Sequence, residues 1–138
     1  MSILKVETIN EKTSGNGVII PDHIIQTVQH LHSATGATNA GRLDMSAGGG
    51  FVDVFSKAIT TKIANSKILV LCKCIAHTAA SDMRVKSKML RGSTEIYTDP
   101  YAWYGVAGEM DTHTSIHIDS PSASAGTSLT YKLQASNV

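Results

Sequence analysis

The stretch SKILVLCKCIAH, residues Ser66 to His77, indicates the fold class most strongly. Successive side chains of a β-strand point to opposite faces of a sheet, so an extended chain divides this stretch into two alternating sets. Both sets are largely apolar: one holds Ile68, Val70, Cys72 and Cys74, and the other holds Leu69, Leu71, Lys73 and Ile75. The pattern predicts a strand covered on both faces for most of its length, as in the core of a β-sandwich.

Other strand patterns lie on both sides of this stretch. MRVKSKMLR, from Met83 to Arg91, alternates basic with mostly apolar residues and predicts a half-buried strand with a basic outer face. RGST, from Arg91 to Thr94, supplies a hairpin turn into the next strand. Further strands are expected at 51–60, 112–118 and 128–134. Seven or eight short strands between turns rich in Gly, Pro and Ser predict an all-β, antiparallel sandwich or jelly-roll-like body.

The N-terminal region is expected to form an extended β arm, residues 1–21, ahead of a body at 22–138. Ile3 to Ile9 and Gly17 to Ile20 are two extended segments around the polar hinge SGNG. HIIQTVQHL, from His23 to Leu31, alternates as a strand does, although a short amphipathic helix matches it too; we favour the strand. Ser33 to Gly50 is expected to form a long loop.

Composition limits the function classes. The 138 residues (14.6 kDa) suit one ordinary domain and a short arm. With 17% charged residues and a net charge of +1, nucleic acid is not an expected partner. No apolar run is long enough for membrane insertion, and no secretory signal is recognisable, so we expect folding in a cytoplasm with Cys72 and Cys74 reduced.

Few residues suggest catalysis or metal binding. His30 and His32 share one strand face and are a weak candidate for an axial metal ion between three chains, but ordinary exposed or hydrogen-bonded histidines are the favoured interpretation. His113 and His117 would stand about 13 Å apart on a strand, too far for one ion. We find no nucleophile and base pair, so an enzyme is not expected, and neither is a cofactor.

One segment concentrates aromatic residues. YTDPYAWYG, from Tyr97 to Gly105, holds Tyr101, Trp103 and Tyr104 in a chain with only 5% aromatics. Aromatic loops stack on sugars and form binding hot spots, which makes these three residues candidates for glycan or protein contact. Packing under a loop or at a subunit interface is the favoured alternative.

Several motifs together resemble a known family. ILKVETI, SGNGVII and HIIQTVQ are similar to the N-terminal pattern of tail-fibre-like structural proteins of bacteriophages, especially marine and cyanobacterial phages. SKILVLCKC resembles that family's core strand, MLRGSTEI its hairpin, and HTSIHIDSPSASAGTSLTYKLQ its segment near the end. The resemblance covers most of the chain.

The resemblance implies a non-enzymatic, β-rich and usually trimeric protein on the outside of a virion. It would be a homotrimer assembled in the host cytoplasm, joined to tail or capsid proteins through its arm and able to contact a host surface glycan. Exposed β edges of an arm pair readily with other chains. A capsid decoration or cement protein, and a soluble carbohydrate-binding jelly roll, are the alternatives. The apolar contacts of the arm would be Ile3, Val6, Ile9, Val18 and Ile20.

Overall fold

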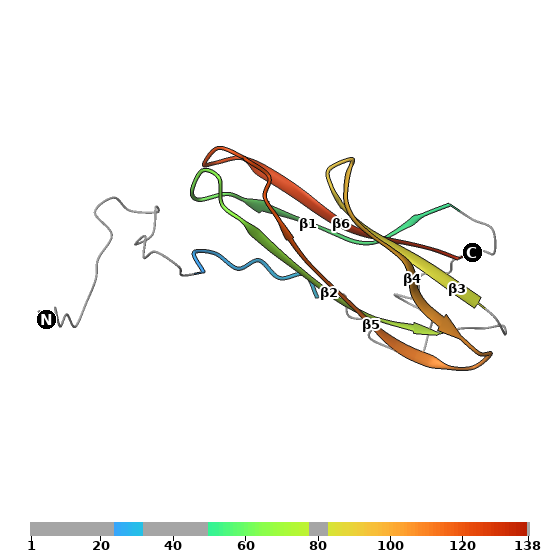
Figure 1. Cartoon of the computed structure of the whole chain (residues 1–138). Helices are drawn as coiled ribbons and strands as arrows, with labels where there is room; N and C mark the ends of the chain where they lie inside the picture. The colour runs from blue at the N-terminus through green and yellow to red at the C-terminus, as the bar shows by residue number, and fades with distance from the viewer. Residues whose placement is uncertain (1–23, 32–49, 78–82, 138) are drawn as a thin grey trace, which may run out of the picture.

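A computed structural model describes residues 24–31, 50–77 and 83–137 of the chain (Figure 1). These residues form six β-strands and no helix, so the all-β prediction is confirmed. In the described ranges no helix is long and apolar enough to cross a membrane. The strands are β1 (Val52–Thr60), β2 (Ile68–His77), β3 (Met83–Arg91), β4 (Thr94–Gly105), β5 (Met110–Asp119) and β6 (Ser128–Asn137).

The strands form two antiparallel sheets that face each other as the layers of a sandwich (Figure 1). One sheet has the order β1-β6-β3-β4 and is called the four-stranded sheet. The other pairs β2 with β5 over ten consecutive residues and is called the two-stranded sheet. A tight turn leads from β4 into β5 and so connects the layers along one side. This architecture confirms the antiparallel sandwich.

The core between the sheets follows the alternation of β3. Val85, Ser87 and Met89 are fully buried, whereas the basic residues between them lie toward solvent, as predicted for a half-buried strand. Met89 packs with Leu133 of the same sheet and Cys72 of the opposite sheet. Cys72 and Cys74 form no disulfide within the described residues, and Cys72 is buried.

The hairpin between β3 and β4 closes through two residues, as expected for RGST. Arg91 and Thr94 are paired across it, and Gly92 has a φ of +60°. A glycine at the first central position is the requirement of a type II′ turn, because a side chain there would be strained. The Gly92 N–H also donates to the Thr130 carbonyl at 2.7 Å, which attaches the hairpin to β6.

At the same end of the sandwich, buried Thr61 joins the loop after β1 to the loop before β6. Its hydroxyl donates to the Ser124 carbonyl at 2.6 Å and accepts the Thr127 N–H at 3.1 Å. Its own N–H donates to the Thr127 carbonyl at 2.9 Å. These bonds satisfy polar groups that the loops bury, as a compact domain requires.

The strand predicted at His23 to Leu31 is wrong for the residues that the structure describes. Residues 24–31 form no strand, because no described strand pairs with them and isolated extended chain has no ladder of hydrogen bonds. Ile24 and Leu31 are 82% and 78% exposed. The arm at 1–21 lies outside the described residues, as does the expected loop except for its last residue, so the division at residue 21 stays a prediction.

The expectation that β2 is covered on both faces is also wrong. Cys72 is buried on the inner face, but Leu69, Leu71 and Ile75 on the outer face are exposed. The reason is topological: β2 belongs to a two-stranded outer layer, and in the described part of the chain nothing packs on its far side.

Candidate functional site

The outer surface of the two-stranded sheet is unusually apolar and is the main candidate for a functional surface. Leu69 stands opposite Ile118, and Leu71 opposite Ile116, in two adjacent cross-strand pairs. Ile75 extends the row beyond Lys73, the one charged residue of β2. The five aliphatic side chains, between 60% and 68% exposed, are here called the apolar face: Leu69, Leu71, Ile75, Ile116 and Ile118.

The side chains of strand β5 follow the reverse of the usual burial pattern, because its polar residues point inward. His113, Ser115 and Asp119 are buried against the four-stranded sheet, while Ile116 and Ile118 point outward. A strand with one solvated face normally buries its apolar set and exposes its polar set. This reversed pattern indicates that the outer face of β5 is suited to contact with another surface rather than with solvent.

The inward polar groups of β5 have partners. The His113 Nε2 lies 2.6 Å from the Ser115 hydroxyl and 3.3 Å from that of Ser87 on β3. The His117 ring lies 5.6 Å from the Tyr97 ring. His113 and His117 are therefore engaged in packing, and the described residues hold no group of three or more side chains suited to a metal ion.

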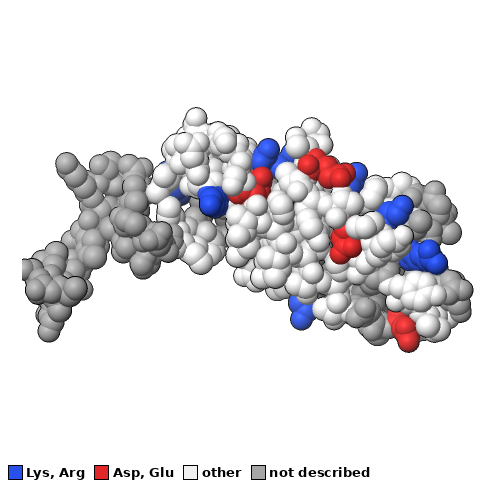
Figure 2. Space-filling model, viewed as in Figure 1, with Lys and Arg blue, Asp and Glu red and all other residues white. Residues whose placement is uncertain are grey.

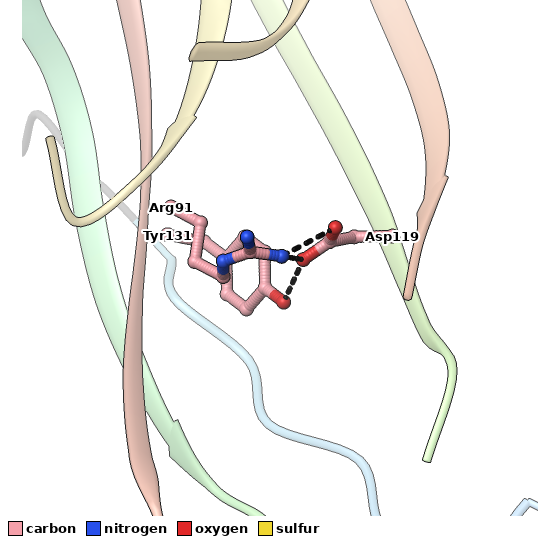
Figure 3. A network of polar contacts seen from close by, with 3 residues as sticks. All are labelled: Arg91, Asp119 and Tyr131. Atoms are coloured by element: carbon pink, nitrogen blue, oxygen red, sulfur yellow. Dashed lines mark hydrogen bonds and ion pairs between the residues drawn. The ribbon is translucent and has the colours of Figure 1, made fainter. Parts of the chain in front are cut away.

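Asp119 forms the strongest link between the two layers (Figure 3). Its carboxylate accepts two hydrogen bonds from the Arg91 guanidinium, at 2.7 and 2.8 Å, and one from the Tyr131 hydroxyl at 2.6 Å. Arg91 and Tyr131 come from the four-stranded sheet and Asp119 from the two-stranded sheet. Burial and the bond to Asp119 raise the pKa of Tyr131. All three groups are used in holding the layers together, so the network is structural.

The outer face of the four-stranded sheet has a different character. Asp53 on β1 accepts hydrogen bonds from Lys132 at 3.1 Å and from Gln134 at 2.6 Å. The bond from Gln134, followed by that from Lys132, lowers the pKa of Asp53. Charged side chains are few and scattered in the view of Figure 2, with wide uncharged areas between them. One layer thus presents polar pairs to solvent and the other presents aliphatic groups.

The aromatic segment lies in a strand rather than in the expected loop, because β4 continues to Gly105. Tyr101 and Tyr104 are 73% and 57% exposed, and the Arg84 guanidinium carbon stands 5.9 Å from the centre of the Tyr104 ring. Next to them β4 bulges at Asp99, whose carboxylate accepts the Tyr101 N–H at 3.1 Å. The structure places Trp103 in the same strand by its backbone. The three predicted contact residues therefore belong to one sheet edge.

The remaining predicted residues are not brought together by the described structure. His30 stacks on Phe55 of β1 with 6.2 Å between ring centres, and His32 lies outside the described residues. The arm residues Ile3, Val6, Ile9, Val18 and Ile20 also lie outside them.

Sequence reasoning missed the apolar face. Its signal was the aliphatic content of both alternating sets in β2, together with Ile116 and Ile118 in THTSIHID. Two apolar sets indicate that both faces of a strand are covered, but not whether the cover comes from the same chain.

Comparisons with known proteins add no identity: no protein-family model matches the chain, and neither a curated protein nor a solved structure does.

Proposed function

We propose that this protein is a non-enzymatic structural component of a phage virion, a homotrimer displayed on the particle surface in the manner of a tail fibre. The apolar face carries the proposal. Contiguous apolar patches of more than a few hundred Å² are rare on monomers and mark sites of association. The inverted strand β5 supports it, since aliphatic groups point outward there while histidine, serine and aspartate are buried.

Self-association is the simplest use of such a face. Most soluble oligomers are symmetric assemblies of identical chains, and their interfaces resemble a domain core divided in two. The motifs that resemble those of tail-fibre-like proteins favour three copies. In this arrangement Leu71 and Ile116, at the middle of the apolar face, are buried between subunits.

Light scattering on the purified chain tests the assembly. We expect a trimer for the wild type and a folded monomer for Leu71→Lys, because a buried, unpaired ammonium is costly. Val106→Lys is the matched control, since Val106 is 52% exposed in the turn between β4 and β5, away from the apolar face. A monomeric wild type, or a Leu71→Lys variant that remains trimeric, would contradict the proposal.

The arm at 1–21 is proposed to attach the body to tail or capsid proteins through Ile3, Val6, Ile9, Val18 and Ile20. A chain lacking residues 1–21 is expected to fold and oligomerise but to be missing from purified particles, as measured by mass spectrometry. Incorporation at the wild-type level would refute attachment by the arm. Gold labelling of wild-type particles distinguishes a tail position from a decoration of the capsid.

Host contact is proposed for the β4 edge. Tyr101 and Tyr104 are exposed, with Tyr104 beside Arg84, and exposed aromatic rings stack on sugars. The same observation favours the second candidate, a soluble carbohydrate-binding protein. A glycan array should lose its signal with Tyr101→Ala and Trp103→Ala and keep it with Val106→Ala. If the variants bind glycans as the wild type does, the segment is not the glycan-binding site. If the protein binds glycans but is not found in purified particles, the second candidate is favoured.

A further inference from the structure

The two-stranded sheet has an edge that the described chain leaves unpaired. β2 is hydrogen-bonded to β5 alone, and no other described strand lies on its second side. β5 differs, because its own second side is turned toward β4, with which it is in contact. A two-stranded sheet is only marginally stable by itself, and unpaired backbone groups at its edge favour the addition of another strand.

Of the sheet edges, that of β2 is the least protected against strand addition. β1 carries a register irregularity between Asp53 and Phe55. β4 carries two irregularities and Pro100, which has no N–H to donate. Bulges and prolines are the devices by which proteins block edge pairing. β2 has neither: all ten of its residues pair with β5 in one uninterrupted register, and only Lys73 is charged.

Residues 24–31 have a strand-like sequence but do not pair with any strand of the described structure. Their sequence, IIQTVQHL, alternates, and the segment contains no proline or glycine. Ile24 and Leu31 are largely exposed, and Ile25 and Val28 are 42% and 41% exposed. Within the described residues, no backbone hydrogen bond joins this segment to a strand. Its described contact is the stacking of His30 on Phe55.

We propose that residues 24–31 of one copy add as a strand to the free edge of β2 in a second copy. The inference rests on the proposed self-assembly and specifies how neighbouring copies are joined. Eight residues of alternating sequence match most of the ten-residue length of β2. The added backbone satisfies the unpaired N–H and C=O groups of β2, as in β-augmentation.

Strand addition also accounts for the exposed side chains of the segment. Alternate residues of an added strand lie on the outer side of the two-stranded sheet, so either Ile24 and Val28 or Ile25 and Leu31 become continuous with the apolar face. The sheet then has three strands with a hydrophobic face, the arrangement that gives a small sheet independent stability. The second copy is the occupant because the segment's own chain leaves Ile24 and Leu31 largely in solvent.

Hydrogen exchange of the backbone amides of β2, followed by NMR on the full chain, tests the pairing. In the wild type, amides of β2 that do not donate to β5 should be protected. The double variant Thr27→Pro/Val28→Pro should make them exchange at least tenfold faster, because one of two consecutive residues always faces the neighbouring strand. Thr27→Ala/Val28→Ala is the matched control and should keep the protection. Unprotected outward amides in the wild type would overturn the proposal.

Photo-crosslinking establishes that the strand comes from another copy, and it needs no destabilised variant. A benzophenone amino acid replaces exposed Gln29, and isotopically light and heavy chains are refolded together. Crosslinks from position 29 to the β2 peptide should join light with heavy chains in about half of the cases. Crosslinks confined to one isotope, or an absence of crosslinks to β2, would overturn strand donation. Because the light-scattering test with Leu71→Lys is independent, a trimer without these crosslinks leaves the proposed function standing.

Discussion

At the scale of single residues, Asp119 is the group on which the contact between the layers depends most. Its carboxylate is 7% exposed and accepts hydrogen bonds from Arg91 and Tyr131. Asp119→Ala leaves the Arg91 guanidinium without its partner in a partly buried site, and we expect the free energy of unfolding to fall by about 3 kcal/mol.

Urea denaturation at one fixed protein concentration measures this loss. The control is Asp53→Ala, which removes an exposed carboxylate paired with Lys132 and should cost at most about 1 kcal/mol. Equal effects of the two substitutions would contradict the structural role of the buried network.

The buried thiol of Cys72 should make the free energy of unfolding fall at alkaline pH. Burial, with a smaller contribution from Cys74, raises the pKa of its thiol from 9.0 to about 12. The folded state thus retains a proton that the unfolded state releases, so stability is fully present below pH 9 and is lost as the pH rises from about 9 to about 12. The slope due to this group is at most about 1.4 kcal/mol per pH unit. Urea titrations from pH 7 to 11 should show the fall, and a flatter profile is expected for Cys72→Ala.

At the scale of elements, the β3–β4 hairpin depends on Gly92. An alanine in its left-handed conformation is strained, and Gly92→Ala should lower the free energy of unfolding by about 1–2 kcal/mol. Gly50→Ala is the matched control, because Gly50 has no positive φ and an added Cβ meets no atom within 4 Å. Thermal denaturation of both variants checks this; an effect of Gly92→Ala no larger than that of Gly50→Ala would show that the turn tolerates a side chain.

At the scale of the whole molecule, stability should depend on concentration. An assembly that binds the folded state only raises the melting temperature as protein concentration increases. Differential scanning calorimetry over a hundredfold range of concentration should show this rise for the wild type and its absence for Leu71→Lys. A concentration-independent transition in the wild type would mean that the apolar face does not bind another copy.

Most of the described strands could be predicted because alternation is local, although β4 runs on to Gly105 through a segment that was expected to form a loop. In β3, Val85, Ser87 and Met89 face the core and the basic residues face outward as their spacing requires. The two-residue hairpin followed from Gly92. The network around Asp119 could not be predicted, since its members are 12 and 28 residues away along the chain and meet only when two sheets stack.

The sequence thus determined the alternation of the strands, the turn residues and the all-β class, because each of these depends on residues a few positions apart. Strand pairing and layer order came from long-range packing. For this reason β2, with apolar residues on both faces, has one face in the core and the other in solvent, and residues 24–31 alternate without forming a strand. A sequence specifies which side chains must be covered. Whether the same chain or a second chain covers them depends on how the layers pack in the folded molecule.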